Sequence, residues 1–168
     1  MSMKKYKSTI ISFFVVLIVI GGLILISRAN QQNDVPNDSV KTQKIVAEEP
    51  LFDFGSVSMA SGLVKHSFVV RNISSEPIKV SKMYTSCMCT KASILYKDES
   101  VGPFGMPGHG FLPSVDVTID PNSEAKIEVV FDPAAHGPAG IGPASRSVFI
   151  ESKESAPLTL SFSVNVTP

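Results

Sequence analysis

The sequence predicts an all-β domain, a sandwich of about seven to eight antiparallel strands, preceded by one transmembrane helix. Three observations carry this prediction: an uncharged apolar run near the N-terminus, short β-type runs after residue 44, and Gly, Pro, Asn and Asp clusters between those runs. No stretch of ten residues after 44 has the helical period. The 168 residues therefore hold one domain of ordinary size behind an N-terminal segment.

The apolar run covers residues 10 to 26, IISFFVVLIVIGGLILI, and contains no charge. As a helix it is about 25 Å long, and with its flanking serines and threonine it reaches about 30 Å, the thickness of the hydrocarbon core. We therefore expect a transmembrane helix over 10–27, after a cytoplasmic N-terminus at 1–9. A signal peptide cleaved after Ala29 is the alternative, because Ser27 and Ala29 fit the small-residue pattern of a cleavage site.

Basic residues decide the expected topology. Lys4, Lys5 and Lys7 precede the run, whereas Arg28 on its other side is followed by Asp34 and Asp38. This lysine excess keeps the N-terminus in the cytoplasm. The expectation is a single-pass protein of the cytoplasmic (inner) membrane, held there by residues 10–27, with its C-terminal domain outside the cytoplasm.

Residues 28–43, RANQQNDVPNDSVKTQ, lack the apolar side chains needed for a core and read as a flexible linker. The extracytoplasmic domain then covers 44–168. Eight candidate strands, a number typical of an immunoglobulin-like sandwich, are predicted at 51–54, 63–71, 78–84, 90–95, 115–119, 125–131, 145–151 and 158–166.

Period-2 alternation identifies the core face of these strands. The last strand shows it most clearly, since five apolar side chains alternate with Thr, Ser and Asn. The predicted core residues are Leu158, Leu160, Phe162, Val164 and Val166, with Ile127, Val129, Phe131, Phe68 and Val70.

Composition excludes several classes of function. Fifteen basic and fifteen acidic residues cancel, so nucleic acid is not an expected partner. The chain has no Gly-x-Ser-x-Gly elbow, no phosphate-binding glycine loop and no His-Glu-x-x-His motif, so neither an enzyme nor a small-molecule substrate is evident. Two cysteines are too few to hold a small secreted scaffold together.

Four segments, FDFGSV, HSFVVRNISSEPIKV, SCMCT and IDPNSEAKIEVVFDP, together resemble the bacterial Domain of Unknown Function 1573 family over nearly all of residues 45–166. That family is similar to immunoglobulin-like domains of the ASPM, SPD-2 and Hydin type. The resemblance implies a sandwich in the cell envelope and no settled activity. The usual family motif is Cys-Gly-Cys-Thr, and this chain departs from it with Met88 in place of glycine.

The pair Cys87 and Cys89 is the chemically distinctive motif. In an extended strand their Cα atoms would lie about 6.6 Å apart, near the limit for a disulfide, so a disulfide requires a bent backbone. Three interpretations remain open: small buried side chains or an oxidised pair, a soft site for copper(I) or zinc, and a redox-active thiol pair.

Three more side chains are candidate ligands for such a metal. Met106 and His109 have Met-x-x-His spacing in the Gly- and Pro-rich segment 97–114, and His136 lies in a second such loop, 132–144. A simple reversal of direction at each strand would place these two loops at one end of the sandwich and the cysteines at the other, unless segment 97–114 folds back across the sandwich. A single site with all these ligands depends on that condition. His66, in phase with Phe68, is expected at the core margin rather than at a metal.

These observations support three hypotheses. The first is a non-enzymatic module that binds another, unidentified envelope protein through sheet edges or long loops. The second is a copper(I) binding or delivery protein that uses the metal site Cys87, Cys89, Met106, His109 and His136. The third is a thiol-disulfide exchange protein based on the Cys-x-Cys pair.

Overall fold

A computed structural model describes residues 18, 20–22, 41–109 and 114–168, and Val40–Pro168 form one compact unit. Ten strands lie in the described part of the chain. They are β1 (Ile45–Ala47), β2 (Leu51–Ser58), β3 (Val64–Asn72), β4 (Ile78–Thr85), β5 (Thr90–Tyr96), β6 (Glu99–Phe104), β7 (Val117–Ile119), β8 (Glu124–Phe131), β9 (Gly142–Ser152) and β10 (Leu158–Thr167). The described residues also include two short 3-10 helices, η1 (Met59–Ser61) and η2 (Gly137–Gly140).

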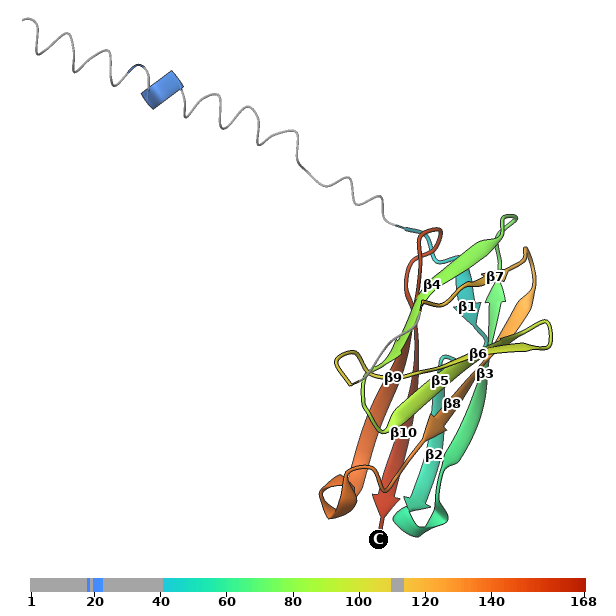
Figure 1. The fold of residues 1–168 in the computed structure, drawn as a ribbon, viewed down its shortest axis with the longest axis vertical. Helices are drawn as coiled ribbons and strands as arrows, with labels where there is room; N and C mark the ends of the chain where they lie inside the picture. The colour runs from blue at the N-terminus through green and yellow to red at the C-terminus, as the bar shows by residue number, and fades with distance from the viewer. Residues whose placement is uncertain (1–17, 19, 23–40, 110–113) are drawn as a thin grey trace, which may run out of the picture. The chain divides into compact units, whose positions relative to one another are not determined.

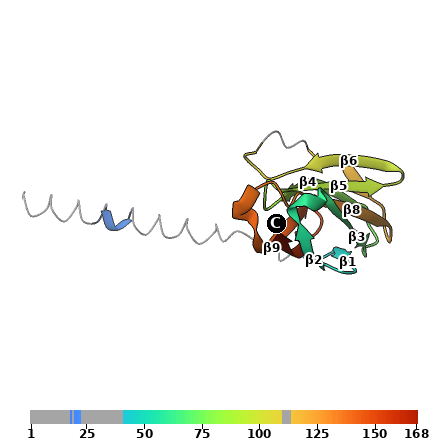
Figure 2. The same cartoon turned by 90° about the horizontal axis from the view of Figure 1, so that it is seen from below.

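The strands form two five-stranded sheets, with the orders β1-β3-β8-β5-β6 and β2-β10-β9-β4-β7 (Figure 1). The view along the strands shows the two layers packed face to face (Figure 2). The predicted all-β sandwich is confirmed. Two details differ, since the described residues contain ten strands rather than seven to eight, and β2 pairs with β10 in parallel.

Between the sheets lies the apolar core that the alternation predicts. Side chains from the inner faces of β3, β8 and β10 are buried, and they include every predicted core residue. Phe68, Ile127 and Leu160 are among the largest fully buried side chains. Burial of such side chains contributes roughly 1.5 to 3 kcal/mol each, so the packed strands stabilise the domain without many cross-links.

The segment 97–114 is not the single long loop that the sequence predicts. Lys97 and Asp98 have φ values of 49° and 66° and form a tight turn, after which β6 pairs antiparallel with β5. Such left-handed two-residue turns match the twist of a hairpin. The additional strand reverses the chain direction once more, and this moves the cysteines to the same end of the sandwich as the loop that follows β8.

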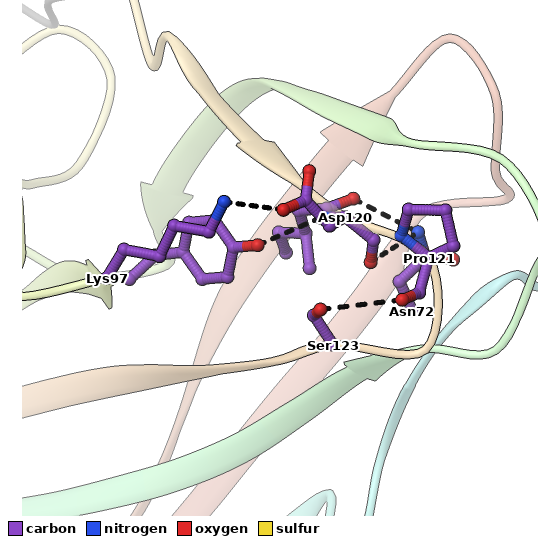
Figure 3. A network of polar contacts seen from close by, with 7 residues as sticks. Asn72, Lys97, Asp120, Pro121 and Ser123 are labelled. Carbon is purple, nitrogen blue, oxygen red and sulfur yellow. Dashed lines mark hydrogen bonds and ion pairs between the residues drawn. The ribbon is translucent and has the colours of Figure 1, made fainter.

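The opposite end of the sandwich, which we call the asparagine pole, is held by the buried amide of Asn72 (Figure 3). Its nitrogen donates to the carbonyls of Glu76, Ile119 and Asp120 at 2.8, 3.1 and 3.1 Å. The side chain of Lys97 pairs with Asp120. One side chain therefore ties the end of β3 to the end of β7.

The chain enters the domain at this same pole. The buried hydroxyl of Ser155 accepts the amides of Lys44 and Ile45 at 2.9 and 3.2 Å, and Ala156 donates its amide to Thr42 at 3.1 Å. β1 then pairs with the end of β3. These contacts hold residues 42–45 against the loop between β9 and β10.

Most of the N-terminal predictions lie outside the described residues. Ile18 and residues 20–22 are helical, whereas the rest of 1–9, 10–27 and most of the linker 28–43 are not described. No helix within the described ranges is long and apolar enough to cross a membrane. The transmembrane helix stays a prediction from the sequence.

Candidate functional site

The cysteines lie in the tight turn that joins β4 to β5. Thr90 donates its amide to the carbonyl of Cys87 at 3.2 Å, and the buried hydroxyl of Thr85 lies 2.9 Å from the same oxygen. These bonds bend the backbone until the Cα atoms of Cys87 and Cys89 are 5.3 Å apart, which is ordinary disulfide spacing. The two sulfurs form a disulfide.

The loop after β8 brings a histidine to this turn. Asp132 donates its amide to the carbonyl of Cys89 at 2.9 Å, which fixes the start of the loop. His136 then precedes η2, with its Nε2 3.2 Å from Sγ of Cys87. A Cβ atom on Gly140 would lie 3.0 Å from Cβ of His136, so the small residue at 140 leaves room for the histidine.

An arginine from the second sheet reaches the other sulfur. Arg146, near the start of β9, donates from Nε to Sγ of Cys89 at 3.3 Å and from Nη1 to the carbonyl of Ser145 at 2.8 Å. No sequence pattern identifies this residue as a neighbour of the cysteines, because it is 57 positions from Cys89 and no motif spacing links the two. We call the group Cys87, Cys89, His136 and Arg146 the cysteine pole.

The two cysteines of the cysteine pole are buried residues with exposed neighbours. Cys87 is 9 % exposed and Cys89 3 % exposed. Met88 between them is 47 % exposed, and His136 is also exposed. The sulfur of Cys87 therefore lies beside an exposed imidazole ring.

Of the predicted metal ligands, the structure brings together Cys87, Cys89 and His136, whose ligand atoms all lie within 4.8 Å of one another. His109 is exposed and is not a member of this group. Met106 is half-buried and follows Gly105, whose carbonyl accepts the amide of Thr85 at 3.1 Å. The chain just before Met106 therefore lies beside the end of β4. The cysteine turn begins directly after that strand.

A second feature is the open side of the sandwich between β2 and β3. The ring of His66 stacks on Phe52 with centroids 3.6 Å apart and 11° between planes, and Phe54 meets both rings edge to face. We call Phe52, Phe54 and His66 the aromatic seam. Burial lowers the pKa of His66, and the charge of Glu49 opposes this shift. His66 thus lies at the core margin, as its phase with Phe68 predicts.

Both strands that flank the seam have a free edge. β2 is the end strand of its sheet. β1 covers β3 only at Val70, Arg71 and Asn72, and Glu48 adds one bond to Val69 at 3.3 Å. Among the described residues, no strand pairs with this side of β3 from Val64 to Phe68. Edge strands of this kind present unpaired N–H and C=O groups.

Comparisons with known proteins agree with the architecture. The family model "Protein of unknown function (DUF1573)" matches residues 45–103, from β1 into β6. The matched range contains FDFGSV, HSFVVRNISSEPIKV and SCMCT, whereas IDPNSEAKIEVVFDP lies beyond it. No curated protein sequence matches the chain significantly.

Solved structures are similar in fold at low sequence identity. A protein of unknown function from Porphyromonas gingivalis W83 is 12 % identical with a TM-score of 0.54, over 74 % of this chain and 47 % of that chain. The ASH / PapD-like domain 7 of human CEP192 is 12 % identical, with a TM-score of 0.43, over 75 % and 87 %. The CupB2 chaperone of Pseudomonas aeruginosa is 15 % identical, with a TM-score of 0.39, over 72 % and 55 %. This chain thus spans about half the length of the Porphyromonas protein.

Proposed function

We propose that the domain is a protein-binding module that captures an extended segment of another protein along the aromatic seam. The observation that carries the proposal is the pair of free edges, β2 and the first half of β3, on either side of half-buried aromatic rings. An added strand gains main-chain hydrogen bonds at such an edge, and its alternate side chains gain apolar contacts.

The edge of β2 is suited to this pairing. Ser161 donates its amide to the carbonyl of Pro50 at 2.8 Å, so the backbone groups of Leu51, one residue on, point away from β10. The side chains of Leu51 and Leu63 are 74 % and 62 % exposed near the ends of the two strands. A partner strand paired at Leu51 would place alternate apolar side chains over the rings of the seam and its other side chains beside Leu51, and it would extend toward Leu63.

The setting of this module follows from the sequence and is part of the proposal. Residues 10–27 would hold the chain in the cytoplasmic membrane, and the lysine excess before them would keep the domain outside the cytoplasm. The partner would then be another protein of the envelope. The linker 28–43 would let the domain reach it.

Site-specific photo-cross-linking in native membranes tests the proposal. A photoreactive residue at Leu51 should capture one dominant protein, and the cross-linked peptide should have alternating apolar residues. The control position is Ile73, which is 53 % exposed at the asparagine pole. With the photoreactive residue at 51, Leu63→Lys should abolish the cross-link, since lysine protects sheet edges. Equal yields at 51 and 73, or no change with Leu63→Lys, would contradict a docking seam.

Copper(I) binding is a second candidate, because three soft ligands converge at the cysteine pole. Reduction of the disulfide would free two thiolates beside His136, a set that suits copper(I). Two thiolates and one copper(I) carry one net negative charge, and the guanidinium of Arg146 beside Cys89 would balance it. Zinc(II) with the same two thiolates would leave the arginine without an opposing charge.

Titration of the full-length protein in detergent tests this candidate. The reduced protein should retain one equivalent of copper(I) against a competing chelator, whereas the oxidised protein and the double variant Cys87→Ser/Cys89→Ser should retain none. His136→Gln should weaken retention, and His109→Gln, a matched change outside the ligand group, should not. No retained metal in the reduced protein would exclude the copper candidate and leave the docking seam untouched.

A further inference from the structure

The cysteine pole surrounds the two sulfurs of one disulfide in different ways. Cys87, 9 % exposed, lies beside exposed Met88 and His136. Cys89, 3 % exposed, receives a hydrogen bond from the guanidinium of Arg146. One sulfur therefore borders exposed side chains, and the other has a cationic donor.

We propose that Cys87–Cys89 is a thiol-disulfide exchange site that accepts electrons from cysteine thiols of a partner protein, with Cys87 as the attacked sulfur and Arg146 stabilising the departing Cys89. This activity goes beyond capture of a segment at the aromatic seam and does not depend on it. The arginine is a positioning and charge-stabilising residue.

The reaction balances without any other reagent. A partner thiolate attacks Sγ of Cys87, a new disulfide forms between the two proteins, and the Cys87–Cys89 bond breaks with its electron pair on Sγ of Cys89. A second thiolate of the partner then attacks the partner's sulfur in the mixed disulfide and releases Cys87. The pair has gained two electrons and, on protonation, two protons, and the partner dithiol has become a disulfide.

The position of Arg146 suits the departing sulfur. Nε donates to Cys89 from 3.3 Å, and a second nitrogen of the guanidinium is held by the carbonyl of Ser145 at 2.8 Å. Hydrogen bonds from a charged donor are about twice as strong as neutral ones, and cationic neighbours favour the thiolate over the thiol. Arg146 therefore stabilises the Cys89 thiolate, formed when the disulfide opens, more than it stabilises the disulfide itself.

The turn keeps its shape through bonds that do not involve the sulfurs. The amide of Asp132 holds the carbonyl of Cys89, and the amide of Thr90 holds that of Cys87. The hydroxyl of Thr85 adds a buried contact to the same turn. Opening the disulfide should therefore leave both cysteines in place for the reverse reaction, as an exchange site requires.

Reduction of the full-length oxidised protein in detergent tests the role of Arg146. Dithiothreitol or glutathione is added without denaturant, and thiols are counted by alkylation and mass. The rate constant for reduction should fall roughly tenfold in Arg146→Gln, the loss expected for one charged hydrogen bond. The equilibrium in glutathione buffers should shift toward the disulfide by a similar factor. Arg146→Lys should restore part of the reduction rate and part of the equilibrium constant. Arg71→Gln, which removes a positive charge elsewhere on the domain, should change neither the rate nor the equilibrium.

The direction of attack has its own test. In Cys89→Ser the remaining Cys87 should form a mixed disulfide with oxidised glutathione several times faster than Cys89 does in Cys87→Ser. Circular dichroism of each variant shows whether it is folded. A native disulfide that resists reduction until the protein is unfolded in urea would overturn the proposal, and so would equal reduction rates in wild type and Arg146→Gln.

Discussion

The two ends of the sandwich both gather polar side chains, yet these side chains contact different kinds of atoms. At the asparagine pole, the amide of Asn72 donates to three backbone carbonyl oxygens, which take part in no covalent reaction. At the cysteine pole, Arg146 and His136 face two sulfurs, atoms whose covalent state can change. The first arrangement holds strands together, and the second surrounds the bond that we propose as an exchange site.

The largest expected effect is at the asparagine pole. Asn72→Ala removes a buried amide that donates to three carbonyls and accepts two hydrogen bonds from Ser74, so the free energy of unfolding should fall by about 3 kcal/mol. Urea denaturation followed by circular dichroism measures it. The matched control Asn165→Ala, at an exposed position on β10, should change stability little. If the two variants were equally stable, Asn72 would not be the main contact of its pole.

A smaller effect is expected from the cysteines. The disulfide links residues only two positions apart, so it restricts the unfolded chain little. The double variant Cys87→Ser/Cys89→Ser should therefore lose about 1.5 kcal/mol, the value for so short a loop. Reduced wild type serves as the control in the same urea experiment. A loss larger than that of Asn72→Ala would mean that the disulfide is mainly structural.

The smallest effect is electrostatic and belongs to the asparagine pole. The pKa of Asp120 is lowered, mainly by the hydrogen bond that the carboxylate makes with Lys97 and next by its hydrogen bond with Tyr96. A carboxyl whose pKa is lower in the folded state stabilises the fold above its unfolded pKa and loses that contribution as pH falls through the folded pKa. Asp120→Asn should lower the urea midpoint slightly at pH 7, and the difference should vanish in strong acid. A difference that stays constant with pH would argue against the ion pair.

The sequence predicts the strands better than it predicts the site. Alternation identifies β10 and β8 because each buries one face of a regular strand. It misses β6, ESVGPF, since Gly102 and Pro103 are atypical of a strand interior. That one omission reverses the expected placement of the cysteines relative to the loop of His136. The contact with Arg146 comes from strand pairing across the second sheet, which no local pattern encodes.

The entry of the chain beside Ser155 determines how far the disulfide lies from the N-terminal end of the domain. β8 runs from Glu124, paired with Arg71 near that entry, to Phe131, paired with Thr90 beside the cysteines. At the rise of a strand, this path is roughly 25 Å long. The sandwich thus acts as a spacer of fixed length between the residues where the chain enters it and the Cys87–Cys89 disulfide.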